Sequence, residues 1–174
     1  MIAIYKDTNT INANLNDPAI NELEILVEKY PKYLMFEKTD TLDTELLENS
    51  HHNARRLKKS DQYIESFGVA VLGHSRLGHS IIGSDADDKR FSEVLEILFG
   101  KKLRSNYAIQ EIRDAMHVMT TIRYGGNYLI TYDKKLLEKS QQIFSRFNST
   151  LICNPNECLE KVKKRLYILL KRTS

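Results

Sequence analysis

The sequence has few cysteines, no long apolar run and nearly balanced charge, and each of these excludes a class of protein. Its two cysteines, Cys153 and Cys158, have no histidine close by in the sequence, so we expect reduced thiols rather than a disulfide framework or a zinc site. No stretch approaches the ~20 apolar residues that a membrane-spanning helix needs. The N-terminus lacks the basic and apolar regions of a signal peptide, which predicts a cytoplasmic protein without a membrane partner.

The formal net charge of the 174 residues is only +3, so the chain as a whole is not a polycation. Its basic residues gather in two clusters, one formed by Arg55, Arg56, Lys58 and Lys59, the other by Lys161, Lys163, Lys164, Arg165, Lys171 and Arg172. Either cluster could contact phosphates, and either could equally be a solvated helix face.

Short apolar runs alternate with helical patterns along the whole chain. Strands are predicted at residues 2–6, 33–37, 128–131 and 150–153. Helices are predicted from Pro18, over 41–63, over 85–99, after Asn106, over 134–147 and from Pro155. This alternation predicts one domain, residues 1–174, of the α/β class, with a central parallel β-sheet flanked by helices in three layers (α/β/α).

Three of these helices carry a recognisable start. Asp17 is expected to be the N-cap of the first, with Pro18 at its first position. Ser84 to Asp88 caps the helix over 85–99, and Asn106 caps the helix that carries Asp114. Residues 67–83 contain the repeat Leu-Gly-His-Ser twice, which predicts either a glycine-rich loop or a small hairpin outside the main sheet.

Four carboxylates occupy positions where a parallel sheet could bring them together. Asp7 and Asp133 each follow a strand, Glu45 opens the helix after the second strand, and Asp114 lies in the first half of its helix. Ligand sites of open α/β sheets lie outside the carboxyl ends of the strands. Crowded carboxylates repel one another unless a cation relieves them, and oxygen ligands suit Mg²⁺ or Mn²⁺. Taken singly, each residue could instead be a helix cap or an exposed side chain.

The motifs around these carboxylates resemble those of the PIN-domain nucleases. Asp7-Thr8-Asn9 resembles the family's first-strand motif, Thr44-Glu45-Leu46 its helical glutamate, Asp114-Ala115 its Asp-Ala helix, and Thr131-Tyr132-Asp133-Lys134 its strand ending in Thr-x-Asp-Lys. The resemblance implies a Mg²⁺- or Mn²⁺-dependent ribonuclease in which Asp7, Glu45, Asp114 and Asp133 are the catalytic and metal-binding residues. It also implies that Asn9 and Thr131 steady the carboxylates by hydrogen bonds. Many members are the toxins of toxin–antitoxin pairs (the VapC type), so an antitoxin is a further partner that the resemblance implies.

The chain departs from the family pattern in places. Residues 67–103 form a stretch longer than in compact toxins. Asp43 competes with Glu45 for the second acidic position, and the cluster of Asp85, Asp87 and Asp88 is interpreted as helix capping. His117 is interpreted as a packed or partly exposed residue and is left out of the site. The predicted donor set is therefore oxygen alone, which argues against zinc.

Two other functions are compatible with the same sheet. One is a PIN-like RNA-binding scaffold or regulatory module with weak or no nuclease activity. The other is a phosphotransfer domain like response-regulator receivers, which need an acidic pair after the first strand. This chain has one aspartate there, so that reading ranks last. The sequence leaves the RNA target and a homodimeric state open.

Overall fold

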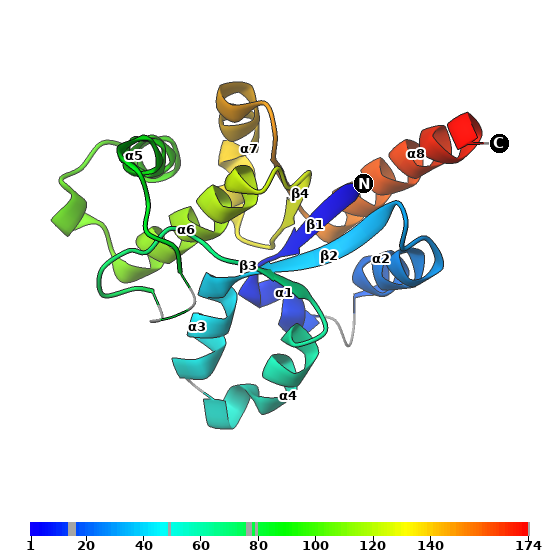
Figure 1. The fold of residues 1–174 in the computed structure, drawn as a ribbon, viewed down its shortest axis with the longest axis horizontal. Coiled ribbons are helices and arrows are strands. Elements are labelled where there is room, and N and C mark those ends of the chain that lie inside the picture. Colours follow the sequence, from blue (N-terminus) through cyan, green and yellow to red (C-terminus); the bar gives the residue numbers. More distant parts are fainter. Residues whose placement is uncertain (14–16, 49, 76–77, 79, 174) are drawn as a thin grey trace.

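The computed structural model describes residues 1–13, 17–48, 50–75, 78 and 80–173 of the chain (Figure 1). Strands and helices alternate over these residues. The elements are, in order, β1 (Ile2–Lys6), α1 (Thr8–Ala13), α2 (Pro18–Lys29), β2 (Leu34–Thr39), α3 (Asp40–Glu48), α4 (Ser50–Ser60), β3 (Ile64–Ser66), α5 (Asp85–Phe99), the 3₁₀ turn η1 (Arg104–Asn106), α6 (Ile109–Arg123), β4 (Tyr128–Ile130), α7 (Lys134–Phe147), β5 (Leu151–Cys153) and α8 (Pro155–Thr173).

The five strands form a single sheet in which every pair is parallel, in the order β3-β2-β1-β4-β5. β1 is therefore central, with Ile4 opposite Phe36 of β2 and Tyr5 opposite Leu129 of β4. The predicted fold class is confirmed. Because all strands point the same way, residues that follow β1 and β4 emerge at the same edge of the sheet.

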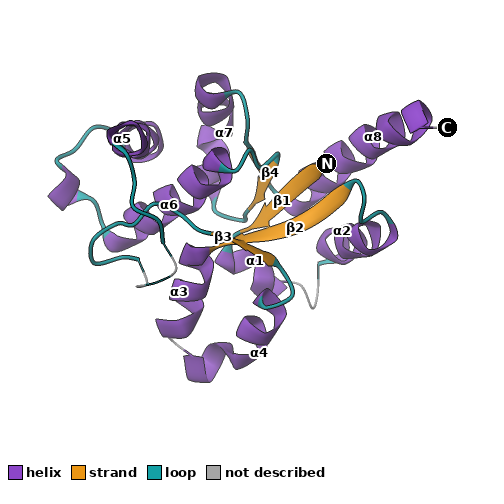
Figure 2. Ribbon diagram, in the orientation of Figure 1, coloured by secondary structure: helices purple, strands orange, loops and turns teal. Residues whose placement is uncertain are grey.

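Helices cover both faces of the sheet, which gives the predicted three layers. Alternate residues of β1 face opposite sides: Ile2 and Ile4 pack with Leu23 of α2 and Val162 of α8, whereas Tyr5 joins the core of the other face. That second core is built from α5, α6 and α7. In Figure 2, α2 and α8 lie to the right of the strands and α5 and α6 to the left. Both cysteines are free and buried in the α2–α8 core.

Two of the three predicted helix starts are confirmed. Asp17 caps α2, its side chain accepting from the amides of Ala19 and Ile20, and Pro18 stands in the first turn. Ser84 and Asp87 form a reciprocal capping box at the start of α5. The predicted cap at Asn106 is wrong, because that residue lies in η1 and the N-cap of α6 is Ala108, two residues further on.

The single helix predicted over 41–63 is also wrong. The chain forms α3 and α4 instead, and β3 follows; residue 49 lies outside the described residues. Leu42, Leu46 and Leu57 pack in one cluster although two helices supply them, so their helical spacing did not reveal the break. β3 is a three-residue edge strand with Ile64 59% exposed, too short and polar to produce an apolar run.

The segment between β3 and α5 is not a hairpin. Val69 and Ile81 form an isolated parallel bridge, and the chain between them makes turns, including one closed by a bond from the Val71 amide to Ser75 Oγ (2.8 Å). The loop alternative therefore holds for the described part of this segment. Leu77 and His79 of the second Leu-Gly-His-Ser copy lie outside the described residues. None of the described helices combines the length and apolarity needed to cross a membrane.

Gly126, which precedes β4, lies too close to Thr121 and Tyr5 to leave room for a side chain. A Cβ atom there would lie 2.6 Å from both Thr121 Cγ2 and Tyr5 Cε2. The Tyr5 ring is fully buried, and its hydroxyl bonds Glu37 and Ser66, so it cannot move aside freely. We expect Gly126→Ala to lower the free energy of unfolding by about 1–3 kcal/mol. Urea denaturation measures this, and unchanged stability would contradict the packing described.

Candidate metal centre at the carboxyl edge of the sheet

All four predicted carboxylates line one open pocket with a volume of about 360 Å³. Asp7 directly follows β1, Glu45 lies in α3, Asp114 in α6, and Asp133 directly precedes α7. Figure 1 shows α1, α3 and α6 meeting near the carboxyl ends of β1 and β2. The pocket therefore forms where a parallel α/β sheet places ligand sites.

Asp7 is the most strongly held of the four. Its Oδ1 accepts the Thr8 amide (2.6 Å), and its Oδ2 accepts the Asn9 amide group (2.8 Å) and the Thr131 hydroxyl (2.6 Å). Burial raises the pKa of Asp7, although the charge of His117 and the hydrogen bond from Thr131 oppose that shift. Asp7 is thus a carboxylate fixed in direction and removed from water.

Asn9 and Thr131 join the ends of β1 and β4, as the family motifs imply. Asn9 Nδ2 lies 3.1 Å from Thr131 Oγ1, and Asn9 Oδ1 accepts the Tyr132 amide at 3.2 Å. Thr131 Oγ1 also accepts the amide of Asp133 at 3.0 Å. The two side chains therefore set the relative positions of Asp7 and Asp133.

Asp133 combines two roles that the sequence left as alternatives. Its Oδ1 accepts the amides of Lys135 (2.7 Å) and Leu136 (3.3 Å), so it is the N-cap of α7. The same carboxylate lines the pocket. A helix cap at the end of β4 can therefore also present negative charge to the pocket.

The pKa of Asp114 is affected by the neighbouring carboxylates. Burial first, and then the charges of Asp7 and Asp133, raise its pKa to about 6 against the opposing hydrogen bond from Gln110. Gln110, one turn earlier on α6, donates to Asp114 Oδ1 (2.9 Å) and reaches Glu45 Oε1 (3.4 Å). Sequence reasoning missed Gln110, although its i, i+4 spacing from Asp114 places both on one helix face.

Glu45 is held by Thr8 and His117. The Thr8 hydroxyl donates to its Oε2, and His117 Nε2 lies 3.4 Å from the same oxygen. Burial opposes ionisation of Glu45, but the hydrogen bond and charge of His117 outweigh it and lower the pKa to about 2. Glu45 is therefore ionised at any pH near neutrality.

His117 is packed, as one of the two alternatives held, but it lies in the candidate metal group from which the sequence interpretation had left it out. It is 1% exposed, and its Nε2 faces Glu45 and Asp7, with 3.9 Å to Asp7 Oδ1. Burial favours the neutral ring, yet the bond to Glu45 and the nearby carboxylates raise the pKa of His117 to about 9. Its position three residues after Asp114 was the available signal, since i and i+3 share a helix face.

Asp7, Glu45 and His117 form a group that could hold a metal ion, because one donor atom from each lies within 4.8 Å of the others. Asp114 and Asp133 line the same pocket outside this group. The candidate donor atoms therefore include an imidazole nitrogen beside the carboxylate oxygens that the sequence predicted.

Two arginines, Arg56 and Arg113, lie at the rim of the pocket. The sequence had indicated only Arg56, as a member of a basic cluster. Arg113 donates two hydrogen bonds to Glu48, and Arg56 donates to Asn53 Oδ1 (2.7 Å). Both arginines line the pocket. Glu48 is a carboxylate and balances the charge of Arg113, whereas Asn53 is neutral and does not balance the charge of Arg56.

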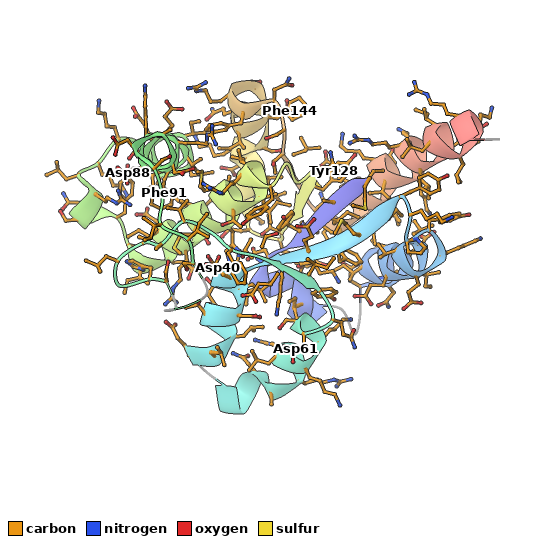
Figure 3. All side chains as sticks on the ribbon, viewed as in Figure 1. Asp40, Asp61, Asp88, Phe91, Tyr128 and Phe144 are labelled. Atoms are coloured by element: carbon orange, nitrogen blue, oxygen red, sulfur yellow. The ribbon has the colours of Figure 1, made fainter. Side chains whose placement is uncertain are left out.

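The remaining acids named from the sequence lie elsewhere. Asp43 does not take the second acidic position, because it pairs with Lys38 (2.6 Å) and accepts from Ser60. Asp87 caps α5 and pairs with Arg123, which agrees with the capping interpretation. Asp88 lies in the first turn of α5, and Figure 3 shows it apart from Asp40 at the start of α3.

Comparison with known proteins adds no relative. No protein-family model matches the chain, and neither does any curated protein or any solved structure. The fold and the site together define an α/β protein with a buried acid–histidine group that could hold a metal ion. The likeness to the PIN-domain family rests on the sequence motifs alone.

Proposed function

We propose that this protein is a PIN-like, divalent-metal-dependent endoribonuclease that hydrolyses RNA phosphodiester bonds. The observation that carries the proposal is the convergence of Asp7, Glu45, Asp114 and Asp133 on one pocket at the carboxyl edge of the sheet. Two of the four have a raised pKa, Asp7 through burial and Asp114 through burial and neighbouring charge. A divalent cation would relieve that crowding.

The residues present fit such a cation. Asp7 and Glu45 offer oxygen ligands close to each other, and Asp114 and Asp133 can bind directly or through water. Bound Mg²⁺ or Mn²⁺ supplies an activated water and stabilises negative charge on the phosphoryl oxygens. Asn9 and Thr131 hold Asp7 in place through the hydrogen bonds at its Oδ2.

Side chains of the protein can orient the attacking water and bind the phosphates of the substrate. Glu45, ionised near neutrality, is placed to orient the attacking water by accepting a hydrogen bond from it. Arg56 and Arg113 at the rim offer guanidinium groups to the phosphates of a bound strand. RNA is proposed as the substrate because the motifs around Asp7 and Asp133 resemble those of the PIN-domain ribonucleases.

A toxin role in a toxin–antitoxin pair is part of the same proposal. It rests on the resemblance to toxin members of the family, and its partner would be an antitoxin protein. A small adjacent reading frame encoding a DNA-binding protein would support that role, whereas an isolated gene would count against it.

Removal of metal tests the enzymatic proposal. Cleavage of mixed labelled RNA should be lost in chelator and restored by Mg²⁺ or Mn²⁺ added alone. Activity should also fall in acid, because protons compete with metal for the carboxylates. Full activity in chelator, or restoration by zinc alone, would contradict the proposed mechanism.

One observation favours the alternative of an RNA-binding scaffold with little or no nuclease activity. The raised pKa of His117 places an internal positive charge between Asp7 and Glu45, so the group is partly neutralised without metal. In the assay above, this alternative predicts RNA binding with no cleavage under any of the metals.

The basic rim gives a separate prediction for RNA affinity. Arg56 lines the pocket, whereas Lys163 and Lys164 of α8 do not. Lys163 pairs with Glu22 of α2, and Lys164 pairs with Glu160 of α8. In Figure 1, α8 extends away from α3 and α4. We expect Arg56→Ala to weaken single-stranded RNA binding and to reduce the slope of log affinity against log salt by about 0.7. The double variant Lys163→Ala/Lys164→Ala is the matched control and should leave the slope unchanged. Fluorescence anisotropy over a salt series measures the affinity and the slope for each variant. A reduced slope in the lysine double variant, with an unchanged slope in Arg56→Ala, would place the RNA on α8 instead.

A further inference from the structure

We propose that His117 Nε2 is a direct metal ligand beside Asp7 and Glu45, and that this nitrogen makes the centre selective for Mn²⁺ over Mg²⁺. The inference rests on the metal centre of the proposed function but not on its RNA chemistry. It begins from the observation that a ring nitrogen, and not only oxygens, lies among the donor atoms that fall within 4.8 Å of one another.

The imidazole of His117 is held in the orientation that a metal ligand needs. Its Nδ1 lies 2.6 Å from Thr39 Oγ1, and the same hydroxyl accepts the Leu42 amide at 3.3 Å. Histidine ligands almost always have their second ring nitrogen hydrogen-bonded, which fixes the tautomer and the ring plane. With Nδ1 held by Thr39, Nε2 is the ring nitrogen that faces Glu45 and Asp7.

Nε2 faces donors on two other elements. Glu45 Oε2 of α3 lies 3.4 Å away and Asp7 Oδ1, after β1, lies 3.9 Å away. His117 and Asp7 are buried, at 1% and 7% exposure, and the side chain of Glu45 is 11% exposed. An ion between them would replace the proton on Nε2, and that proton would leave to solvent as the metal–nitrogen bond forms.

A mixed nitrogen and oxygen donor set changes which ion binds best. Mg²⁺ is a hard ion that keeps several waters and is bound through carboxylates, so an imidazole contributes little to its binding. First-row transition ions, Mn²⁺ among them, accept imidazole nitrogen. His117 should therefore contribute to Mn²⁺ affinity and only weakly to Mg²⁺ affinity.

A rival role for His117 predicts the opposite sign. If the ring stays protonated and serves only as an internal counter-charge, it repels any cation. Its removal would then strengthen the binding of both ions. The direction of the change in affinity separates the two roles.

Calorimetric titration of the metal-stripped protein with each ion tests the proposal. His117→Gln should weaken Mn²⁺ binding by about tenfold or more, and Mg²⁺ binding by less than about threefold. His74→Gln is the matched control, since His74 lies outside the group and should change neither affinity. Unchanged or tighter Mn²⁺ binding in His117→Gln would overturn the proposal.

A second measurement needs no variant and so does not depend on how His117→Gln folds. Electron spin-echo envelope modulation of Mn²⁺ bound to the wild-type protein should show ¹⁴N coupling from a coordinated imidazole. Absence of that coupling overturns the assignment even if RNA is cleaved. Its presence in a protein that cleaves no RNA would uphold the ligand and reject the nuclease function.

Discussion

Asp114→Asn should abolish RNA cleavage while making the metal-free protein more stable. The substitution removes one pocket charge and keeps an oxygen to accept the bond from Gln110, so the fold is retained. Loss of a carboxylate that holds metal removes several kcal/mol of stabilisation from the transition state, which corresponds to at least about a thousandfold in rate. Single-turnover cleavage of labelled RNA in Mn²⁺ measures the loss.

The stability gain has a defined pH dependence. The pKa of Asp114 is raised to about 6 by burial and by the charges of Asp7 and Asp133, so the folded state disfavours its ionised form. That penalty is absent below the unfolded pKa of about 4, grows between about 4 and 6, and is fully present above about 6. Asp114→Asn should therefore gain on the order of 1–2 kcal/mol near pH 8 and nothing near pH 4.

Urea denaturation in chelator at the two pH values checks this sign. Wild-type protein is the reference at each pH. Asp7 and Glu45 are present in both proteins, so the difference in the free energy of unfolding reports Asp114. A variant that keeps its activity would remove Asp114 from the site. A variant that is equally destabilised at both pH values would show that Asp114 has a packing role instead.

Asp133→Asn should also lose at least about a hundredfold in cleavage rate, for the same loss of negative charge at the pocket. Its stability should change by less than about 0.5 kcal/mol, because asparagine caps helices as well as aspartate does. The retained bonds are those that Oδ1 accepts from Lys135 and Leu136. The cleavage assay and urea denaturation together report the two roles.

Asp133→Ala is the matched control for that separation. It removes both the charge and the cap of α7, so activity should fall equally while the free energy of unfolding drops by about 1 kcal/mol. If Asp133→Asn were as unstable as Asp133→Ala, the cap would depend on charge. If Asp133→Asn kept full activity, Asp133 would be a cap alone.

The sequence predicted the parts of this structure that local patterns encode. The strands β1 and β4 are apolar and buried, so both were visible, and the aspartates after them were placed on one edge by the parallel sheet. Caps such as Asp17 and Ser84 were visible because they bond amides only two or three residues away. Edge strand β3 and the break between α3 and α4 produced no comparable pattern.

His117 shows why the rest of the site could not be predicted. Its role depends on Thr39 at the end of β2, Glu45 of α3 and Asp7 after β1, which contact it only once the chain has folded. Asp43 was a plausible rival of Glu45 for a similar reason. Only the ion pair with Lys38 and the bond from Ser60 assign it to another part of the molecule.

The most direct test of the account follows metal occupancy and RNA cleavage in the same samples. Mn²⁺ is titrated into metal-stripped wild-type protein and Asp114→Asn, with bound Mn²⁺ read by electron paramagnetic resonance and cleavage rate measured at each point. The account predicts that the wild-type rate rises in proportion to occupancy, and that Asp114→Asn binds Mn²⁺ more weakly and cleaves at least about a thousandfold more slowly. Cleavage that is complete before any Mn²⁺ binds, or that is equal in the two proteins, would contradict it.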